Sequence, residues 1–250
     1  MKIAFLTAGG NAPCLAASIG RLIKNYSEAD PSIEMIGYLH GYKGLLSGKF
    51  ITISKDVIDA AEILYEFGGS PIGNSRVKLS NIDDCINKGY IKEGENPLEV
   101  AAKQLIRDEV NILHTIGGDD TNTMAGELVA HLADNGDKLT VVGLPKTIDN
   151  DVFPIQQSLG AWTAAEQGAI FFENIANENT TSSRQLIIHE VMGRHSGWLT
   201  AATAREYRRR LKNRNFLPSF LIDKTRWDVD AVYIPEMEIN ITSESQRLKK

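Results

Sequence analysis

The sequence predicts an α/β fold in which Rossmann-like parallel strands alternate with flanking helices. Short apolar runs bounded by glycines alternate along the chain with segments whose apolar residues recur at helical spacing. Such alternation is typical of βαβ units, whose strands lie parallel in one sheet. With 250 residues and 42% hydrophobic residues, the chain can bury a large core.

The first repeat of this pattern opens the chain. Ile3–Leu6 has the character of a buried strand, Gly9 and Gly10 that of a turn, and residues 15–23 that of a helix. Further helical spacing is found at residues 98–105 and 128–132. The other predicted strands are Ile112–Ile116, Val141–Leu144, Leu186–Val191 and Val232–Glu236.

Composition argues against several classes of protein. A net charge of -5 disfavours a protein that coats nucleic acid, and the basic run from Arg205 to Arg214 is interpreted as a solvated helix end. No run approaches the ~18 apolar residues of a membrane helix, and the first ten residues do not resemble a secretion signal. Cys14 and Cys85 lack histidines at metal-ligand spacing, so free thiols in a cytoplasmic protein are expected.

The glycines after the first strand leave room for an anion. Gly9 and Gly10 remove side chains where backbone amides could approach a phosphate, and the following helix directs its positive end there. A tight turn that needs glycine explains the pair equally well. The glycine pair alone therefore does not identify an anion site, and the turns after the other strands have to be considered with it.

The turn after Ile112–Ile116 contains two adjacent carboxylates, Asp119 and Asp120, behind two glycines. Acids at the start of a helix can simply stabilise it. Beside a phosphate, however, a carboxylate is repelled unless a divalent cation lies between the two groups, and Mg²⁺ commonly uses one or two carboxylates together with substrate phosphates. Asp119 is therefore predicted to bind Mg²⁺.

The turn after Val141–Leu144 combines a cation, a hydroxyl group and two carboxylates. These are Lys146, Thr147, Asp149 and Asp151. Asn and Asp favour turns in general, which explains Asn150 better than it explains Lys146. Phosphoryl transfer to an alcohol requires a base for the hydroxyl proton and a cation for the transferring group. This loop offers both.

Four motifs occur in order: the glycine pair, GGDDTN (117–122), PKTIDND (145–151) and MGRHSGW (192–198). Together they resemble the phosphofructokinase family, over nearly the whole chain. GGD alone also occurs in NAD kinases and lipid kinases, which are not expected to carry PKTIDND followed by MGR. The resemblance implies a two-domain architecture, with residues 1–160 for the phosphoryl donor and Mg²⁺ and residues 161–250 for part of a fructose 6-phosphate site.

The resemblance also assigns roles by matching position. Gly10 would line the donor site, Arg76 would bridge donor and acceptor phosphoryl oxygens, and Asp149 would accept the proton of the sugar 1-hydroxyl. The other substrate-binding positions are Thr147, Ile148, Asp151, Met192, Gly193 and Arg194. The implied cofactor is Mg²⁺, the implied partners are pyrophosphate and fructose 6-phosphate, and a homo-oligomer without nucleic-acid or membrane partners is expected.

Two residues favour pyrophosphate as the donor. ATP-using members of the family resemble GGDGS and PGTIDND, whereas this chain has Asp120 and Lys146 where those have glycine. Asp120 would place bulk and charge where the α-phosphate of a nucleotide would lie. Two unit charges ~4 Å apart interact by about 4 kcal/mol at an effective dielectric of ~20. A part of this interaction energy is enough to select a donor.

The predicted reaction is phosphoryl transfer from pyrophosphate to the 1-hydroxyl of fructose 6-phosphate. The alternatives are an ATP-dependent 6-phosphofructokinase, a noncatalytic subunit that binds phosphate ligands, and a nucleotide kinase that shares the GGD element. Thermal-shift titration with each ligand distinguishes them.

Three departures from the family pattern accompany the resemblance. Gln185 stands where the family has an arginine that reaches a neighbouring subunit, and Arg184 would face the other side of a strand. Arg205–Trp227 is longer than the family norm and is interpreted as an insertion. The family continues beyond Glu236 with a sugar-binding glutamate and a GHxQRGG-like stretch, so the second domain is expected to be incomplete and its sugar site deficient.

Overall fold

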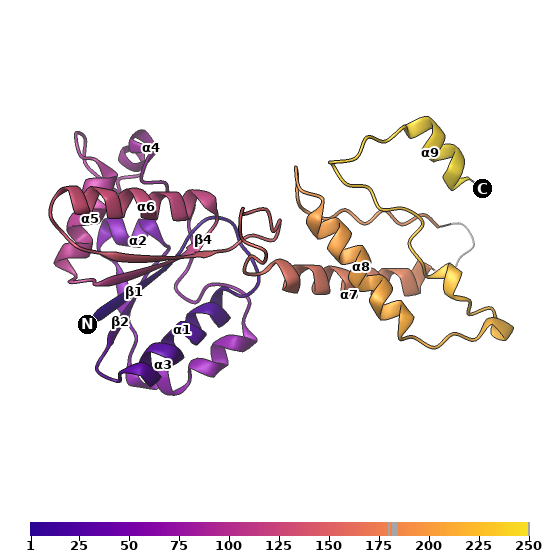
Figure 1. Cartoon of the computed structure of the whole chain (residues 1–250), viewed down its shortest axis with the longest axis horizontal. Coiled ribbons are helices and arrows are strands. Elements are labelled where there is room, and N and C mark those ends of the chain that lie inside the picture. The colour runs from indigo at the N-terminus through magenta and orange to yellow at the C-terminus, as the bar shows by residue number, and fades with distance from the viewer. Residues whose placement is uncertain (180, 182–184, 250) are drawn as a thin grey trace. The chain divides into compact units, whose positions relative to one another are not determined.

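The computed structural model describes residues 1–179, 181 and 185–249. The chain divides into two compact units, Met1–Thr147 and Ile148–Lys250. Figure 1 labels helices of both units and strands of the first. The division falls ahead of Gly160, where the sequence analysis placed a domain change. Ile148 packs against the cluster of Ala165 and Leu199 in the second unit, which accounts for a division before it.

A five-stranded sheet forms the centre of the first unit, all of whose residues are described. Its strands are β1 (Lys2–Thr7), β2 (Glu34–Tyr38), β3 (Phe50–Thr52), β4 (Ile112–Gly117) and β5 (Thr140–Pro145). They lie in the order β3-β2-β1-β4-β5, and all neighbours are parallel except β2 and β3. The predicted α/β class is therefore confirmed, and the turns after β1, β4 and β5 emerge at one edge of the sheet.

Helices cover both faces of this sheet. They are α1 (Leu15–Ala29), α2 (Tyr42–Ser47), α3 (Lys55–Asp59), α4 (Ile82–Asn87), α5 (Pro97–Arg107) and α6 (Asp119–Asp134), with a 3₁₀ turn, η1, at Ala61–Glu66. Figure 1 shows α1 and α3 on one face and α2, α5 and α6 on the other. Leu128 and Leu132 of α6 are buried in the same core cluster as Leu113 of β4, so the helical spacing correctly indicated the packing face.

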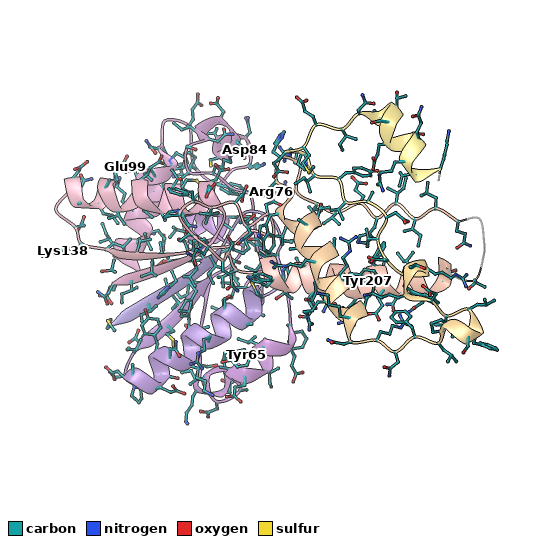
Figure 2. All side chains as sticks on the ribbon, turned by 45° about the vertical axis from the view of Figure 1, so that its right-hand side comes forward. Tyr65, Arg76, Asp84, Glu99, Lys138 and Tyr207 are labelled. Carbon is teal, nitrogen blue, oxygen red and sulfur yellow. The ribbon has the colours of Figure 1, made fainter. Side chains whose placement is uncertain are left out.

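The second unit is built on two packed helices, α7 (Ala161–Asn179) and α8 (Trp198–Lys212). The elements after them are the 3₁₀ turns η2 (Pro218–Phe220) and η3 (Lys224–Arg226) and the helix α9 (Ile241–Leu248). Tyr207 of α8, labelled in Figure 2, is fully buried. Its ring centroid lies 4.7 Å from that of Phe172, and its hydroxyl donates a hydrogen bond to the Trp227 carbonyl (2.6 Å). The stretch interpreted as an insertion thus contributes to a small core.

Carboxylates accompany the basic run in α8. Arg208 pairs with Asp228 (2.9 Å), Arg209 with Glu206 (2.6 Å) and Arg210 with Glu173 (2.7 Å). The guanidinium charges are thus partly offset, as expected for a solvated helix end.

Among the described residues, no helix has the length and apolar character needed to cross a membrane.

Two predicted strands of the second unit are wrong. Residues 186–191 and 232–236 are described, and neither forms a strand. Leu186 and Ile188 are 82% and 84% exposed. A strand needs a neighbour for its amides and carbonyls, and no strand is found in the described part of this unit. The motif MGRHSGW therefore leads into α8, which begins at its Trp198, without following a strand, and Arg184 lies outside the described residues.

Candidate functional site

Three turns of the first unit meet where β1, β4 and β5 end. Gly9 follows β1 with a φ of +88°, which favours glycine. A β-carbon built on Gly9 would lie 3.5 Å from Thr121 Oγ1, 3.7 Å from the Gly118 amide nitrogen and 3.8 Å from Lys146 Nζ. The glycine pair, the GGDD turn and the lysine loop therefore adjoin one another, as the shared edge of a parallel sheet predicts.

A fourth segment brings Arg76 to the same place. The Asn74 side-chain amide donates to the Gly9 carbonyl (2.6 Å), and the Gly9 amide donates to the Ser75 carbonyl (2.9 Å). Arg76 Nη2 consequently lies 4.0 Å from a β-carbon built on Gly10, and Figure 2 labels its side chain. The term "anion cluster" below refers to Gly9, Gly10, Arg76, Gly118 and Lys146.

The turn between β4 and α6 excludes a side chain at Gly117. A β-carbon there would lie 2.4 Å from Thr121 Oγ1. Asn122 closes the turn, since its side-chain amide donates to the Gly117 carbonyl (3.0 Å) and its side-chain oxygen accepts from Thr115 Oγ1 (2.9 Å). α6 then starts after Gly118 without a side-chain cap, so the positive end of the helix adjoins the anion cluster.

Tyr42 fastens the same turn from α2, because its buried hydroxyl donates to the Thr121 carbonyl (2.7 Å). Tyr42→Phe is expected to lower the free energy of unfolding by about 1–2 kcal/mol, since a hydrogen bond made away from water is lost. Urea denaturation measures this change. The control is Tyr65→Phe, at an exposed ring labelled in Figure 2, which should stay within about 0.5 kcal/mol. Equal stability of the two variants would contradict the assigned role of Tyr42.

Lys146 is the buried cation of the anion cluster. Its residue is 3% exposed, and its ammonium group donates a hydrogen bond to the Gly10 carbonyl. Burial lowers the pKa of Lys146; the Cys14 thiol acts in the opposite direction, and the Arg76 guanidinium adds to the lowering. Lys146 is thus the poorly solvated cation of the cluster, and the exposed Arg76 adds a second positive charge. An anion bound there would offset both charges.

Asp119 and Asp120 form the first turn of α6, and both are exposed. Asp120 Oδ2 lies 2.5 Å from Lys78 Nζ, in an ion pair that joins two segments far apart in the sequence. The predicted donor-selecting carboxylate therefore has a cationic partner of its own. Nothing in the sequence analysis anticipated this pair.

Asp149 centres a second group of predicted residues, in the second unit. Burial raises the pKa of this carboxyl group, the Asp151 carboxylate raises it further, and the Arg194 guanidinium lowers it. A β-carbon built on Gly193, whose φ is +143°, would lie 3.9 Å from Asp149 Oδ1. Ser196 Oγ donates a hydrogen bond to the Asp149 carbonyl (3.0 Å), which connects the MGRHSGW segment to this loop.

The predicted site residues therefore fall into two groups, one in each unit. The first unit brings together Gly10, Arg76 and Lys146, with Asp119 and Asp120 in the adjoining turn, and Thr147 ends this unit. The second unit brings together Asp149, Asp151, Gly193 and Arg194. Of the remaining residues, Ile148 packs in the core of the second unit and Met192 is 72% exposed.

Sequence reasoning missed Lys78, although a signal for it exists. Along Arg76, Val77, Lys78 and Leu79, exposed cations alternate with buried apolar residues. This alternation is the period of an extended segment, which directs every second side chain the same way. Since Arg76 was already assigned to the site, Lys78 was the next candidate on that side.

A magnesium ion fits the chemistry of this region. Among the described residues, no three His, Cys, Asp or Glu side chains form a group that could hold a metal ion. A Mg²⁺ site of the predicted kind needs only one or two protein carboxylates, because phosphate oxygens and water complete the coordination. The exposed Asp119, beside the anion cluster, satisfies that requirement.

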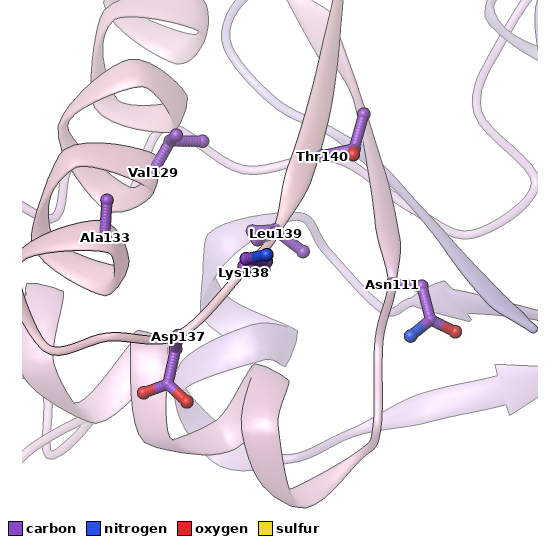
Figure 3. A pocket seen from close by; sticks show the side chains of 7 residues that line it. All are labelled: Asn111, Val129, Ala133, Asp137, Lys138, Leu139 and Thr140. Atoms are coloured by element: carbon purple, nitrogen blue, oxygen red, sulfur yellow. The ribbon is translucent and has the colours of Figure 1, made fainter.

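A hollow of about 470 Å³ lies elsewhere on the first unit. Figure 3 shows residues that line it, among them Asn111 before β4 and Thr140 at the start of β5. These positions are at the amino ends of the strands. Ligands of open α/β sheets bind at the carboxyl ends, so the anion cluster is the stronger candidate site.

Comparison with known proteins covers both units. The family described as "Phosphofructokinase" matches residues 2–250. A pyrophosphate--fructose 6-phosphate 1-phosphotransferase of Methylotuvimicrobium alcaliphilum is 58% identical over 249 residues, which are 100% of this chain and 61% of that protein. One of Propionibacterium freudenreichii is 53% identical over 99% of this chain and 61% of that protein. The chain thus spans 61% of the length of these relatives.

Solved structures agree on the architecture. A pyrophosphate-dependent phosphofructokinase from Marinobacter aquaeolei matches with a TM-score of 0.70 and 24% identity, over 82% of this chain and 50% of that chain. Phosphofructokinase from Saccharomyces cerevisiae matches with a TM-score of 0.62 and 25% identity, over 81% and 27%. At this identity the first likeness shows the fold alone.

Proposed function

The chain belongs to the phosphofructokinase family, and from that premise we propose that it transfers a phosphoryl group from pyrophosphate to the 1-hydroxyl of fructose 6-phosphate. The products are fructose 1,6-bisphosphate and phosphate. The observation that carries the proposal is the anion cluster, in which a buried ammonium, a guanidinium and the start of a helix adjoin two glycines. Relatives that cover the whole chain carry the name of this reaction.

The anion cluster would hold the donor. Gly9 and Gly10 present backbone without side chains, so a phosphate oxygen can approach the Gly10 amide, while the Gly9 amide donates to the Ser75 carbonyl. Lys146 and Arg76 would neutralise the charge that develops as the phosphoryl group leaves, which is the main task of a protein in this reaction. Because Lys146 is buried, its charge is weakly screened, and its effect on a bound anion exceeds that of a surface lysine.

The choice of pyrophosphate over ATP is assigned to Asp120 and Lys146. Asp120 occupies the first turn of α6, next to the glycine turn, where it would meet the further phosphates and sugar of a nucleotide. Pyrophosphate ends before that point. Lys146 would add a cation at the transferred group, which suits a small and highly charged donor.

We assign Mg²⁺ to Asp119. The ion would neutralise donor oxygens beside this carboxylate when it is bound. Asp119 would hold the ion, because the position of a carboxylate at the start of α6 is set by the helix to which it belongs. Removing magnesium with a chelator should therefore weaken pyrophosphate binding.

The acceptor would react at the second group of residues. Asp149 would remove the proton of the sugar 1-hydroxyl as the oxygen bonds to the phosphorus, and the bond from phosphorus to the departing phosphate would break. Arg194, Gly193 and Met192 would contact the sugar phosphate, while Thr147, Ile148 and Asp151 would hold the loop around Asp149. A raised pKa suits Asp149 to this role, because a base works best when its pKa is near the working pH.

The charge of Asp151 offers a test of this assignment. A negative neighbour disfavours ionised Asp149 and raises its pKa, so Asp151→Asn should lower that pKa. The acidic limb of the rate profile should then move to lower pH, whereas Arg194→Met should move it to higher pH. Carbon NMR titration of the Asp149 carboxyl group checks the direction without turnover. Shifts in the opposite directions would contradict the arrangement.

Formation of fructose 1,6-bisphosphate from fructose 6-phosphate with either donor tests the proposed reaction, because this product is common to both donors. The expected result is formation with pyrophosphate, accompanied by phosphate, and little with ATP; formation with ATP alone, accompanied by ADP, would support an ATP-dependent kinase instead. Absence of the product with either donor, in a chain that binds pyrophosphate, would support the noncatalytic subunit. We also assign a cytoplasmic location and a homo-oligomer, which fractionation and sedimentation would test.

A further inference from the structure

The ion pair between Lys78 and Asp120 lies beside the anion cluster. Lys78 Nζ and Asp120 Oδ2 are 2.5 Å apart, and the two side chains are 49% and 70% exposed. Lys78 follows Arg76 by two positions, and Asp120 lies in the turn that contains Gly118. The pair thus links two of the segments that build the candidate donor site.

The backbone that carries Lys78 is fixed against α6. Val77 and Leu79, on either side of it, are buried in the core cluster of the first unit. The Leu79 amide donates to Met124 Sδ of α6 (3.0 Å). Lys78 is therefore anchored on both sides, and its ammonium group reaches the first turn of the same helix. An exposed ion pair between two mobile side chains would contribute little, but here one end is held in place.

Charge alone cannot explain a preference for pyrophosphate over ATP. Both donors are polyanions, so an unpaired carboxylate at Asp120 would repel both. Discrimination instead needs the bulk of Asp120 at one defined place, together with a cation that cancels its charge. The Lys78 ammonium supplies the cation, and the ion pair favours the orientation of the carboxylate that faces Lys78.

We propose that Lys78 is a positioning residue that sets donor specificity: it holds the Asp120 carboxylate where it obstructs a nucleotide and offsets the charge that would repel pyrophosphate. This inference rests on the proposed function. It differs from a direct role, because Lys78 acts through Asp120. Its signature is therefore the ratio of the two donor affinities, which a general loss of positive charge would leave unchanged.

The test measures the dissociation constants of magnesium pyrophosphate and magnesium ATP by titration calorimetry. In Lys78→Met the ratio of the ATP constant to the pyrophosphate constant should fall by about fivefold, the upper range for an exposed pair. In an Asp120→Gly background, where no carboxylate remains to be held, Lys78→Met should leave the ratio unchanged. Lys78→Arg, which keeps the charge, should retain most of the original ratio.

Lys103→Met is the matched control, because Lys103 forms an ion pair of the same length with Glu99 within α5. It should alter neither constant. An unchanged ratio in Lys78→Met, or an equal fall in the Asp120→Gly background, would overturn the role of Lys78. Failure of the unaltered chain to bind pyrophosphate would instead remove the proposed function, so the two failures are distinguishable.

Discussion

Asp149→Asn is expected to reduce the rate of phosphoryl transfer by about 10²–10⁴-fold, the contribution of a positioned base. Asparagine keeps the size of the side chain and the hydrogen bond from Ser196 Oγ to the main-chain carbonyl. It cannot accept the proton of the sugar 1-hydroxyl. The fold and the donor site should therefore persist while the chemical step slows.

The measurement is the single-turnover rate with saturating pyrophosphate and fructose 6-phosphate. The affinity for pyrophosphate should change little, because Asp149 is assigned to the acceptor hydroxyl and the anion cluster to the donor. Asp137→Asn is the control, at the hollow of Figure 3 by the amino ends of the strands, and it should retain the full rate. If Asp149→Asn kept more than a tenth of the rate, another group would be the base.

Asp120→Gly is expected to shift donor preference toward ATP by about tenfold. The substitution removes both the bulk and the charge that the account places in the path of a nucleotide. The charge of Asp120 contributes less than the ~4 kcal/mol of two unit charges at ~4 Å, because the side chain is 70% exposed and paired with Lys78.

Asp120→Asn separates the two effects, because it removes the charge and keeps the size. If bulk decides, asparagine, which also loses the ion pair with Lys78, should lose no more of the preference for pyrophosphate than Lys78→Met does, and glycine should lose more. The measurement is the ratio of kcat/KM for the two donors with the same acceptor. An identical ratio in the unaltered chain and in Asp120→Gly would mean that Asp120 does not select the donor.

Part of the fold of the first unit could be predicted from sequence, because β1, β4 and β5 follow local periodicity, whereas β2 and β3 were not predicted. Ile3–Leu6 and Val141–Leu144 lie within β1 and β5, and the turns after these strands adjoin as parallel pairing requires. The contact of Lys146 with Gly10 follows from that edge. Here a residue's place in the chain determined its place in the site.

The remainder depended on contacts that no local pattern encodes. Tyr42 and Lys78 reach the first turn of α6 from segments far away in the sequence. The run Leu186–Val191 has the composition of a strand, yet it is not one, because a strand also requires a partner and composition does not supply it. Periodicity therefore predicted strands and helices of the first unit better than it predicted the contacts of Tyr42 and Lys78 with the first turn of α6.

The most direct test of the account concerns the first unit and the anion it prefers. Titration of the unaltered chain with pyrophosphate, in magnesium and followed by phosphorus NMR with ATP as competitor, compares the two donors at one site. The account predicts that pyrophosphate displaces ATP and binds at least about tenfold more tightly. Equal or tighter binding of ATP would contradict the assignment of donor choice to Asp120 and Lys146.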